Sequence, residues 1–141
     1  MKKLLSILCC SVILLTVSSC TKQYITPPAP NQNQTITANI ASTDWLAYTD
    51  GKSYYVPIDV AALDDASAQF DGVVVSISYD GGKTYEQLPE VYNGLSFSYT
   101  YNGAGTSSAG NVSIYAQSPD GGTPIKPTDP IMVKIVLVYS N

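Results

Sequence analysis

Apolar and polar residues alternate along the chain from Thr35 onward, and turn residues interrupt this alternation about every 8–12 positions. The clearest stretch is Leu95–Tyr101 (LSFSYTY), which places apolar side chains on one face and hydroxyls on the other. A period of two belongs to β-strands that are buried on one side. Turns at this spacing are typical of sandwiches and barrels. We therefore expect residues 35–141 to form an all-β domain, an antiparallel β-sandwich of about seven or eight strands that is Ig-like or jelly-roll-like.

Turn and breaker residues indicate how these strands are joined. Asp50-Gly51 and Asn93-Gly94 are both typical of type I′ hairpin turns. Pro57 lies inside a strand-like run, and this predicts an edge strand or a bulge because proline lacks the N–H group. The alternation stops over Val60–Phe70, where apolar residues at helical spacing predict a short helical cap. The apolar run Val73–Tyr79 predicts a central strand.

One hairpin carries a recognisable motif, SYDGGKTY, which resembles the Asp-box (S-x-D-x-G-x-T followed by an aromatic residue). In such a turn the aspartate accepts backbone N–H bonds, and glycine adopts a positive φ. Sialidases repeat the motif several times and also use an arginine cluster. Here it occurs once and the chain has no arginine. We interpret it as a structural turn formed by Ser78, Asp80, Gly82, Thr84 and Tyr85.

The first residues have the features of a targeting signal. Two lysines precede the apolar run Leu4–Val17, which is shorter than the roughly 20 residues that a membrane span needs. The following sequence, VSSC, resembles a bacterial lipobox. This resemblance implies that residues 1–19 are a helical lipoprotein signal peptide. It also implies that Cys20 becomes the first mature residue and carries diacylglycerol and an N-acyl chain such as palmitate.

Residues 20–34 are rich in proline, asparagine and glutamine, and we interpret them as a flexible tether. Two or more acyl chains on Cys20 would hold the protein stably at a membrane. By analogy with sorting rules in bacteria that have two membranes, Thr21 favours the outer membrane. The membrane lipid is thus an expected partner, and the face of the outer membrane stays undecided.

Composition argues against several classes of function. The net charge is −4 with no arginine, whereas nucleic-acid binding depends on cationic phosphate contacts. The chain has no histidine, and Cys9 and Cys10 leave with the signal peptide. Glu86 and Glu90 flank Pro89 in a strand-like segment (83–92) that the proline interrupts, and no glycosidase pattern surrounds them. We therefore expect no enzyme activity, no cofactor and no nucleic-acid partner.

Four aspartates surround the expected helical cap. Carboxylates from loops are ligands that Ca²⁺ prefers, but the spacing of these residues matches no EF-hand loop. The alternative is that they serve as helix caps and turn residues. Both interpretations stay open for Asp59, Asp64, Asp65 and Asp71.

The chain has eleven tyrosines, and four of them fall off the main predicted inward faces. Aromatic rings stack on the C–H surfaces of sugars, so such tyrosines are candidates for glycan binding. The alternative is that they fill the core beneath the second sheet. The four candidates are Tyr48, Tyr55, Tyr92 and Tyr115.

The order of motifs after Trp45 also resembles a group of small Bacteroidetes lipoproteins over about residues 35–139. The matching segments are VVVSISYDGGKTYEQLP, YNGLSFSYTY, VSIYAQSPDGG and VKIVLVY. The group usually has tryptophan after the Gly-Gly turn, where this chain has Tyr85. The resemblance implies an envelope lipoprotein with a β-sandwich and brings no activity with it.

The sequence therefore predicts a non-catalytic, membrane-anchored envelope lipoprotein that binds a glycan or a protein. The alternative is a structural component of an outer-membrane complex that has no small-molecule ligand. In that case an exposed edge, either the Pro57 strand or the final strand, would accept a strand from a partner.

Overall fold

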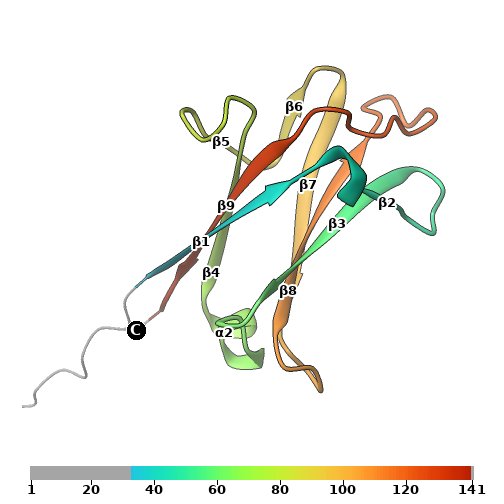
Figure 1. Ribbon diagram of the computed structural model, residues 1–141. Helices are drawn as coiled ribbons and strands as arrows, with labels where there is room; N and C mark the ends of the chain where they lie inside the picture. Colours follow the sequence, from blue (N-terminus) through green and yellow to red (C-terminus); the bar gives the residue numbers. More distant parts are fainter. Residues whose placement is uncertain (1–32, 141) are drawn as a thin grey trace, which may run out of the picture. The chain divides into compact units, whose positions relative to one another are not determined.

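Two antiparallel sheets face each other in the computed structural model, which describes residues 33–140 (Figure 1). One sheet has four strands in the order β1 (Gln34–Ile40), β9 (Ile131–Val138), β4 (Gly72–Ser78) and β5 (Glu86–Gln87). The other has five, in the order β2 (Leu46–Ala47), β3 (Ser53–Val60), β8 (Gly110–Gln117), β7 (Leu95–Asn102) and β6 (Glu90–Tyr92). The predicted antiparallel β-sandwich is confirmed. The described residues form nine strands rather than about seven or eight, and two of them, β2 and β5, have two residues each.

The predicted signal peptide (1–19), Cys20 and nearly all of the tether lie outside the described residues. The strands belong to one compact unit, Asn31–Asn141. No helix in the part of the chain that the structure describes is long and apolar enough to cross a membrane.

The core lies between the inner faces of the two sheets, where the alternating apolar side chains interlock. On β7 the predicted alternation holds for Leu95 and Phe97, which are buried, and fades toward Tyr101, which is 38% exposed. Tyr99, between them, donates a hydrogen bond from its hydroxyl to the Val73 carbonyl of the opposite sheet at 2.7 Å. The largest fully buried aliphatic side chains are Val60, Leu63, Val75, Ile77, Val112, Ile114, Val133, Ile135 and Leu137.

The two predicted type I′ turns differ in the structure. Asn93 and Gly94 both have positive φ angles (49° and 77°) and join Tyr92 directly to Leu95, so this turn is confirmed. The prediction for Asp50-Gly51 is wrong. Gly51 has a positive φ of 65°, whereas Asp50 does not. Its carboxylate instead accepts the N–H groups of Lys52 (2.7 Å) and Ser53 (3.1 Å), which stabilises a longer loop.

Strand positions decide which edges are open. β3 pairs with β8 over its whole length, whereas β2 pairs only with Tyr54 and Tyr55. Among the residues that the structure describes, Pro57 therefore lies on an open edge, as predicted. β9 lies between β1 and β4, and its interpretation as an open edge is wrong. Segment 83–92, expected as one interrupted strand, contributes β5 to one sheet and β6 to the other.

The predicted helical cap is α2 (Asp65–Phe70), one short helix at the end of the sandwich where β4 begins (Figure 1). Asp64 is its N-cap and accepts the backbone N–H of Ser67 at 2.7 Å. The first residue of β1, Gln34, lies toward the same end, because it pairs with Leu137 of β9 next to Gly72 and Val138.

Candidate functional site

Three of the four candidate tyrosines meet on the outer face of the five-stranded sheet. Tyr55 of β3 and Tyr115 of β8 are direct partners across the two strands. Their ring centroids lie 6.1 Å apart at an interplanar angle of 23°. Tyr48, just after β2, packs edge-on against both, at 5.4 Å from Tyr55 and 5.5 Å from Tyr115. We call these three residues the tyrosine triad.

The tyrosine triad points away from the core. Ile114 and Ala116, on either side of Tyr115 in the strand, are fully buried. Successive side chains of a strand point to opposite faces, so Tyr115 points outward. Tyr48 is 39% exposed. No member of the tyrosine triad belongs to the buried cluster, so for these three residues the alternative that they fill the core is wrong.

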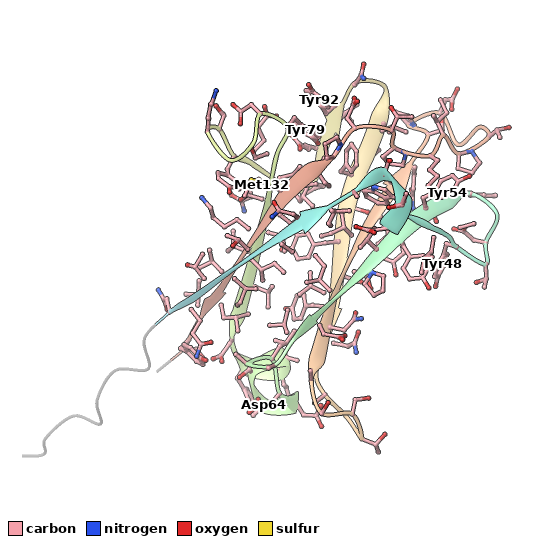
Figure 2. The ribbon with its side chains drawn as sticks, viewed as in Figure 1. Tyr48, Tyr54, Asp64, Tyr79, Tyr92 and Met132 are labelled. Atoms are coloured by element: carbon pink, nitrogen blue, oxygen red, sulfur yellow. The ribbon has the colours of Figure 1, made fainter. Side chains whose placement is uncertain are left out.

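Tyr92 lies elsewhere and contradicts its predicted orientation. It pairs with Leu95, whose side chain faces the core, so Tyr92 lies on the inward side of β6, at the margin of the sandwich. Its ring stacks on Tyr79 at 3.7 Å and 10°. Figure 2 shows Tyr79 and Tyr92 together, well apart from Tyr48. Stacking on Tyr79 covers one face of the Tyr92 ring.

A small cavity of about 120 Å³ is lined by Tyr79 and Tyr92 and, on another side, by Ile125 and Lys126 of the loop between β8 and β9. Ligand pockets usually have about 300–1,000 Å³, so this cavity is small for a sugar or a cofactor. We regard the tyrosine triad as the stronger candidate, because its rings point outward whereas Tyr79 covers one face of the Tyr92 ring.

The two glutamates that flank Pro89 do meet beside this cavity. The Tyr79 hydroxyl donates a hydrogen bond to Oε1 of Glu90 at 2.7 Å. Burial raises the pKa of Glu90, a hydrogen bond with Glu86 raises it further, and the bond from Tyr79 opposes this rise. Burial, followed by the hydrogen bond to Glu90, raises the pKa of Tyr79. Burial and the hydrogen bonds among Tyr79, Glu86 and Glu90 therefore account for the raised pKa values of Tyr79 and Glu90.

The Asp-box-like turn has the hydrogen bonds that its sequence predicts. Asp80 Oδ1 accepts the Ser78 hydroxyl (2.8 Å) and the N–H groups of Lys83 (3.0 Å) and Thr84 (2.9 Å). These bonds, led by the one from the Thr84 backbone, lower the pKa of Asp80 to about 2.

The remaining Asp-box residues lie around this turn. Gly82 has a φ of 89° and donates its N–H to the Ser78 hydroxyl at 2.8 Å. The Tyr85 ring lies under the ammonium group of Lys134, which is 3.5 Å from the ring centroid. All of these contacts join residues of the domain itself, as expected for a structural turn.

The four aspartates near the cap do not converge on one point. Asp64 caps α2, Asp65 accepts the N–H of Gly105 (2.8 Å), and Asp71 accepts that of Ser140 (3.0 Å). Asp59 lies on β3 and faces outward. The residues that the structure describes include no group of three acidic, histidine or cysteine side chains able to hold a metal ion.

Sequence reasoning missed a second feature of the outer sheet face. Asp59 pairs with Asn111, and Asn111 pairs with Asn102, so three polar side chains lie side by side across β3, β8 and β7. We call these residues the polar row. They line a hollow of about 330 Å³ together with Ser107 and Ser108. The sequence alternation could have predicted that these three side chains face outward, because each lies at a position that alternates with the buried residues of its strand.

Comparisons of the chain with protein-family models, curated proteins and solved structures found no match.

Proposed function

We propose that this protein is an envelope lipoprotein, anchored in the outer membrane through acylated Cys20, whose β-sandwich is a non-catalytic module that binds glycans. The observation that carries the proposal is the outward-facing tyrosine triad on the five-stranded sheet, in which Tyr48 is exposed and Tyr55 and Tyr115 are partly buried. The lipobox-like sequence before Cys20 supports the anchor.

The tyrosine triad suits sugar binding for physical reasons. Tyrosine combines a large apolar ring with a polar hydroxyl at its tip. A sugar likewise has apolar C–H surfaces edged by hydroxyls. Each of the three rings contacts the other two, so binding requires little ordering of side chains. Sites that are ordered before binding retain more of the interaction energy as affinity.

The position of the tyrosine triad also suits a protein tethered at its N-terminus. The described chain begins near Gln34, toward the end of the sandwich that α2 closes. Tyr55 lies in the half of β3 farther from α2, because β3 runs from Ser53 toward Val60 and α2 follows Val60. A tether that enters at the α2 end leaves the tyrosine triad accessible on the outer sheet face.

A glycan array tests the proposal, with the full-length lipoprotein purified in detergent. We expect binding to at least one glycan class and loss of that binding in Tyr48→Ala. Tyr101→Ala is the matched control, because Tyr101 is equally exposed (38% against 39%) but lies outside the tyrosine triad. An array without a hit would count against the proposal, as would equal loss in both variants.

The anchor is tested separately by fractionating cells that produce the wild-type protein or Cys20→Ala. We expect the wild-type protein in the outer-membrane fraction and the variant, which would keep its apolar signal segment, outside that fraction. Mass spectrometry should find acyl chains on the wild-type N-terminal cysteine alone. Equal amounts of the two proteins in the outer-membrane fraction would refute the lipid anchor.

A second candidate function, assembly with an envelope protein, is favoured by one observation. Within residues 33–140, β1 pairs only with β9, and its seven residues (QTITANI) contain neither a charge nor a proline. Charges and prolines are the usual devices that protect an edge strand from pairing. A photoreactive residue in place of Thr37, on this edge, should crosslink a partner in cells if β1 accepts a strand. Recovery of the monomer alone would argue against this function.

A further inference from the structure

The outer face of the five-stranded sheet is organised in rows that the strand register defines. One row consists of Tyr55, Tyr115 and Ser98. The next has only small side chains, Pro57, Ser113 and Thr100, and the last is the polar row, Asp59, Asn111 and Asn102. The face therefore has an aromatic end and a polar end, with small side chains between them.

The two ends are farther apart than one sugar ring can reach. Tyr115 and Asn111 are four residues apart on β8. Strands rise about 3.3 Å per residue, so this offset corresponds to about 13 Å along the strand. A ligand that contacts both ends must be an extended chain that runs along β3 and β8.

The polar row has the hydrogen-bonding capacity that sugar hydroxyls need. The Oδ1 atom of Asn111 accepts a hydrogen bond from the Ser113 hydroxyl at 3.0 Å, which fixes the amide so that its NH₂ group is the remaining donor. Asp59 adds a carboxylate acceptor beside it. A sugar hydroxyl both donates and accepts, so adjacent donors and acceptors match it. The hollow at this end, about 330 Å³, has room for such a group.

The charge of this face indicates which glycans fit. Among the outward residues of β3, β7 and β8, Asp59 is the one charged side chain. These positions carry no cation to pair with a carboxylate or a sulfate, and Asp59 repels such groups. From these observations we infer that the tyrosine triad and the polar row form one continuous site for an extended, neutral oligosaccharide. This inference rests on the proposed glycan-binding function.

The test measures the affinity of the full-length lipoprotein for neutral gluco-oligosaccharides from the disaccharide to the hexasaccharide, with α- and β-linked series. Oligogalacturonates of the same lengths are the anionic counterpart. In the wild-type protein we expect the affinity to rise with length and to exceed that for the anionic series. Asn111→Ala should weaken hexasaccharide binding about fivefold to tenfold, because it removes a hydrogen bond, and leave the disaccharide unchanged. Asn39→Ala, an exposed asparagine on β1 of the other sheet, is the matched control and should change neither.

The charge argument has its own variant, Asp59→Asn, which removes the carboxylate and keeps the shape. It should improve binding of the oligogalacturonates severalfold. An affinity that stops rising at the disaccharide, or an Asn111→Ala variant with unchanged hexasaccharide binding, would overturn the inference but leave the tyrosine triad as a smaller site. Tighter binding of the anionic series by the wild-type protein would overturn it too. Absence of binding to both series would overturn the inference for these sugars, and an array without any hit would overturn the proposed function as well.

Discussion

Gly110, the first residue of β8, provides the sharpest test of how the sandwich is packed. It is buried where the segment after β3 and the end of β7 meet. A Cβ atom at this position would overlap the backbone carbonyl oxygen of Leu63 and would lie 2.7 Å from that of Asn102. Both obstacles are backbone atoms, so no change of rotamer can make room for a methyl group.

The magnitude follows from this geometry. Inserting a methyl group into a packed interior costs typically about 1–3 kcal/mol, and more where the backbone must move. We therefore expect Gly110→Ala to lower the free energy of unfolding by about 3 kcal/mol or more. For a domain of this size, 1 kcal/mol corresponds to about 4–8 °C in Tm, so the loss should exceed about 12 °C.

The assay is thermal unfolding of the full-length protein in detergent, followed by circular dichroism. Gly72→Ala is the matched control, because its added Cβ would make only an ordinary contact, 3.5 Å from Cβ of Val138. That variant should change stability by less than about 1 kcal/mol, because alanine also reduces the entropy of the unfolded chain. Similar Tm values for the two variants would refute the packing described for β8.

Three further predictions concern polar contacts. Tyr99→Phe removes the hydroxyl that links the two sheets, and it should cost about 1 kcal/mol in denaturant unfolding; an unchanged midpoint would show that the bond contributes nothing. The raised pKa of Glu90 should make its contribution to stability fully present below its ordinary value of 4.5 and lost as the pH rises through the folded-state pKa. Glu90→Gln should remove this loss of stability with rising pH. A variant whose stability depends on pH as in the wild-type protein would contradict the claim that Glu90 causes the loss. Asp80, whose pKa is lowered from 3.8 to about 2, should show the opposite pH dependence. Its contribution to stability is present above pH 3.8 and is lost as the pH falls toward 2. Asp80→Asn should therefore be less stable at neutral pH, and less sensitive to acid, than the wild-type protein.

The local periodicity of the sequence predicted most of the fold. The alternation in Leu95–Tyr101 and Val73–Tyr79 predicted most of the buried side chains, with Tyr101 as the exception, because strand geometry sends successive residues to opposite faces. Asn93-Gly94 predicted its turn, since both residues accept positive φ angles. The same prediction for Asp50-Gly51 was wrong, although the residue types are similar. The Asp50 carboxylate accepts two backbone N–H groups and favours a different loop.

The assignment of strands to sheets required tertiary information. Nothing local in segment 83–92 indicates that β5 and β6 belong to opposite sheets. The tyrosine triad depends on the register that places Tyr55 opposite Tyr115, and this is a contact between residues far apart in the sequence. Parity identified these two residues as outward-facing but not as neighbours. Parity failed for Tyr92, because the tight hairpin pairs it with inward-facing Leu95.

The most direct test of the account is isothermal titration of the full-length lipoprotein with a neutral glycan selected on the array. We predict measurable affinity in the wild-type protein and at least a tenfold loss in Tyr115→Ala, which corresponds to about 1.4 kcal/mol. Tyr101→Ala should keep the wild-type affinity. Undiminished binding in Tyr115→Ala would contradict the claim that the tyrosine triad is the glycan-binding site.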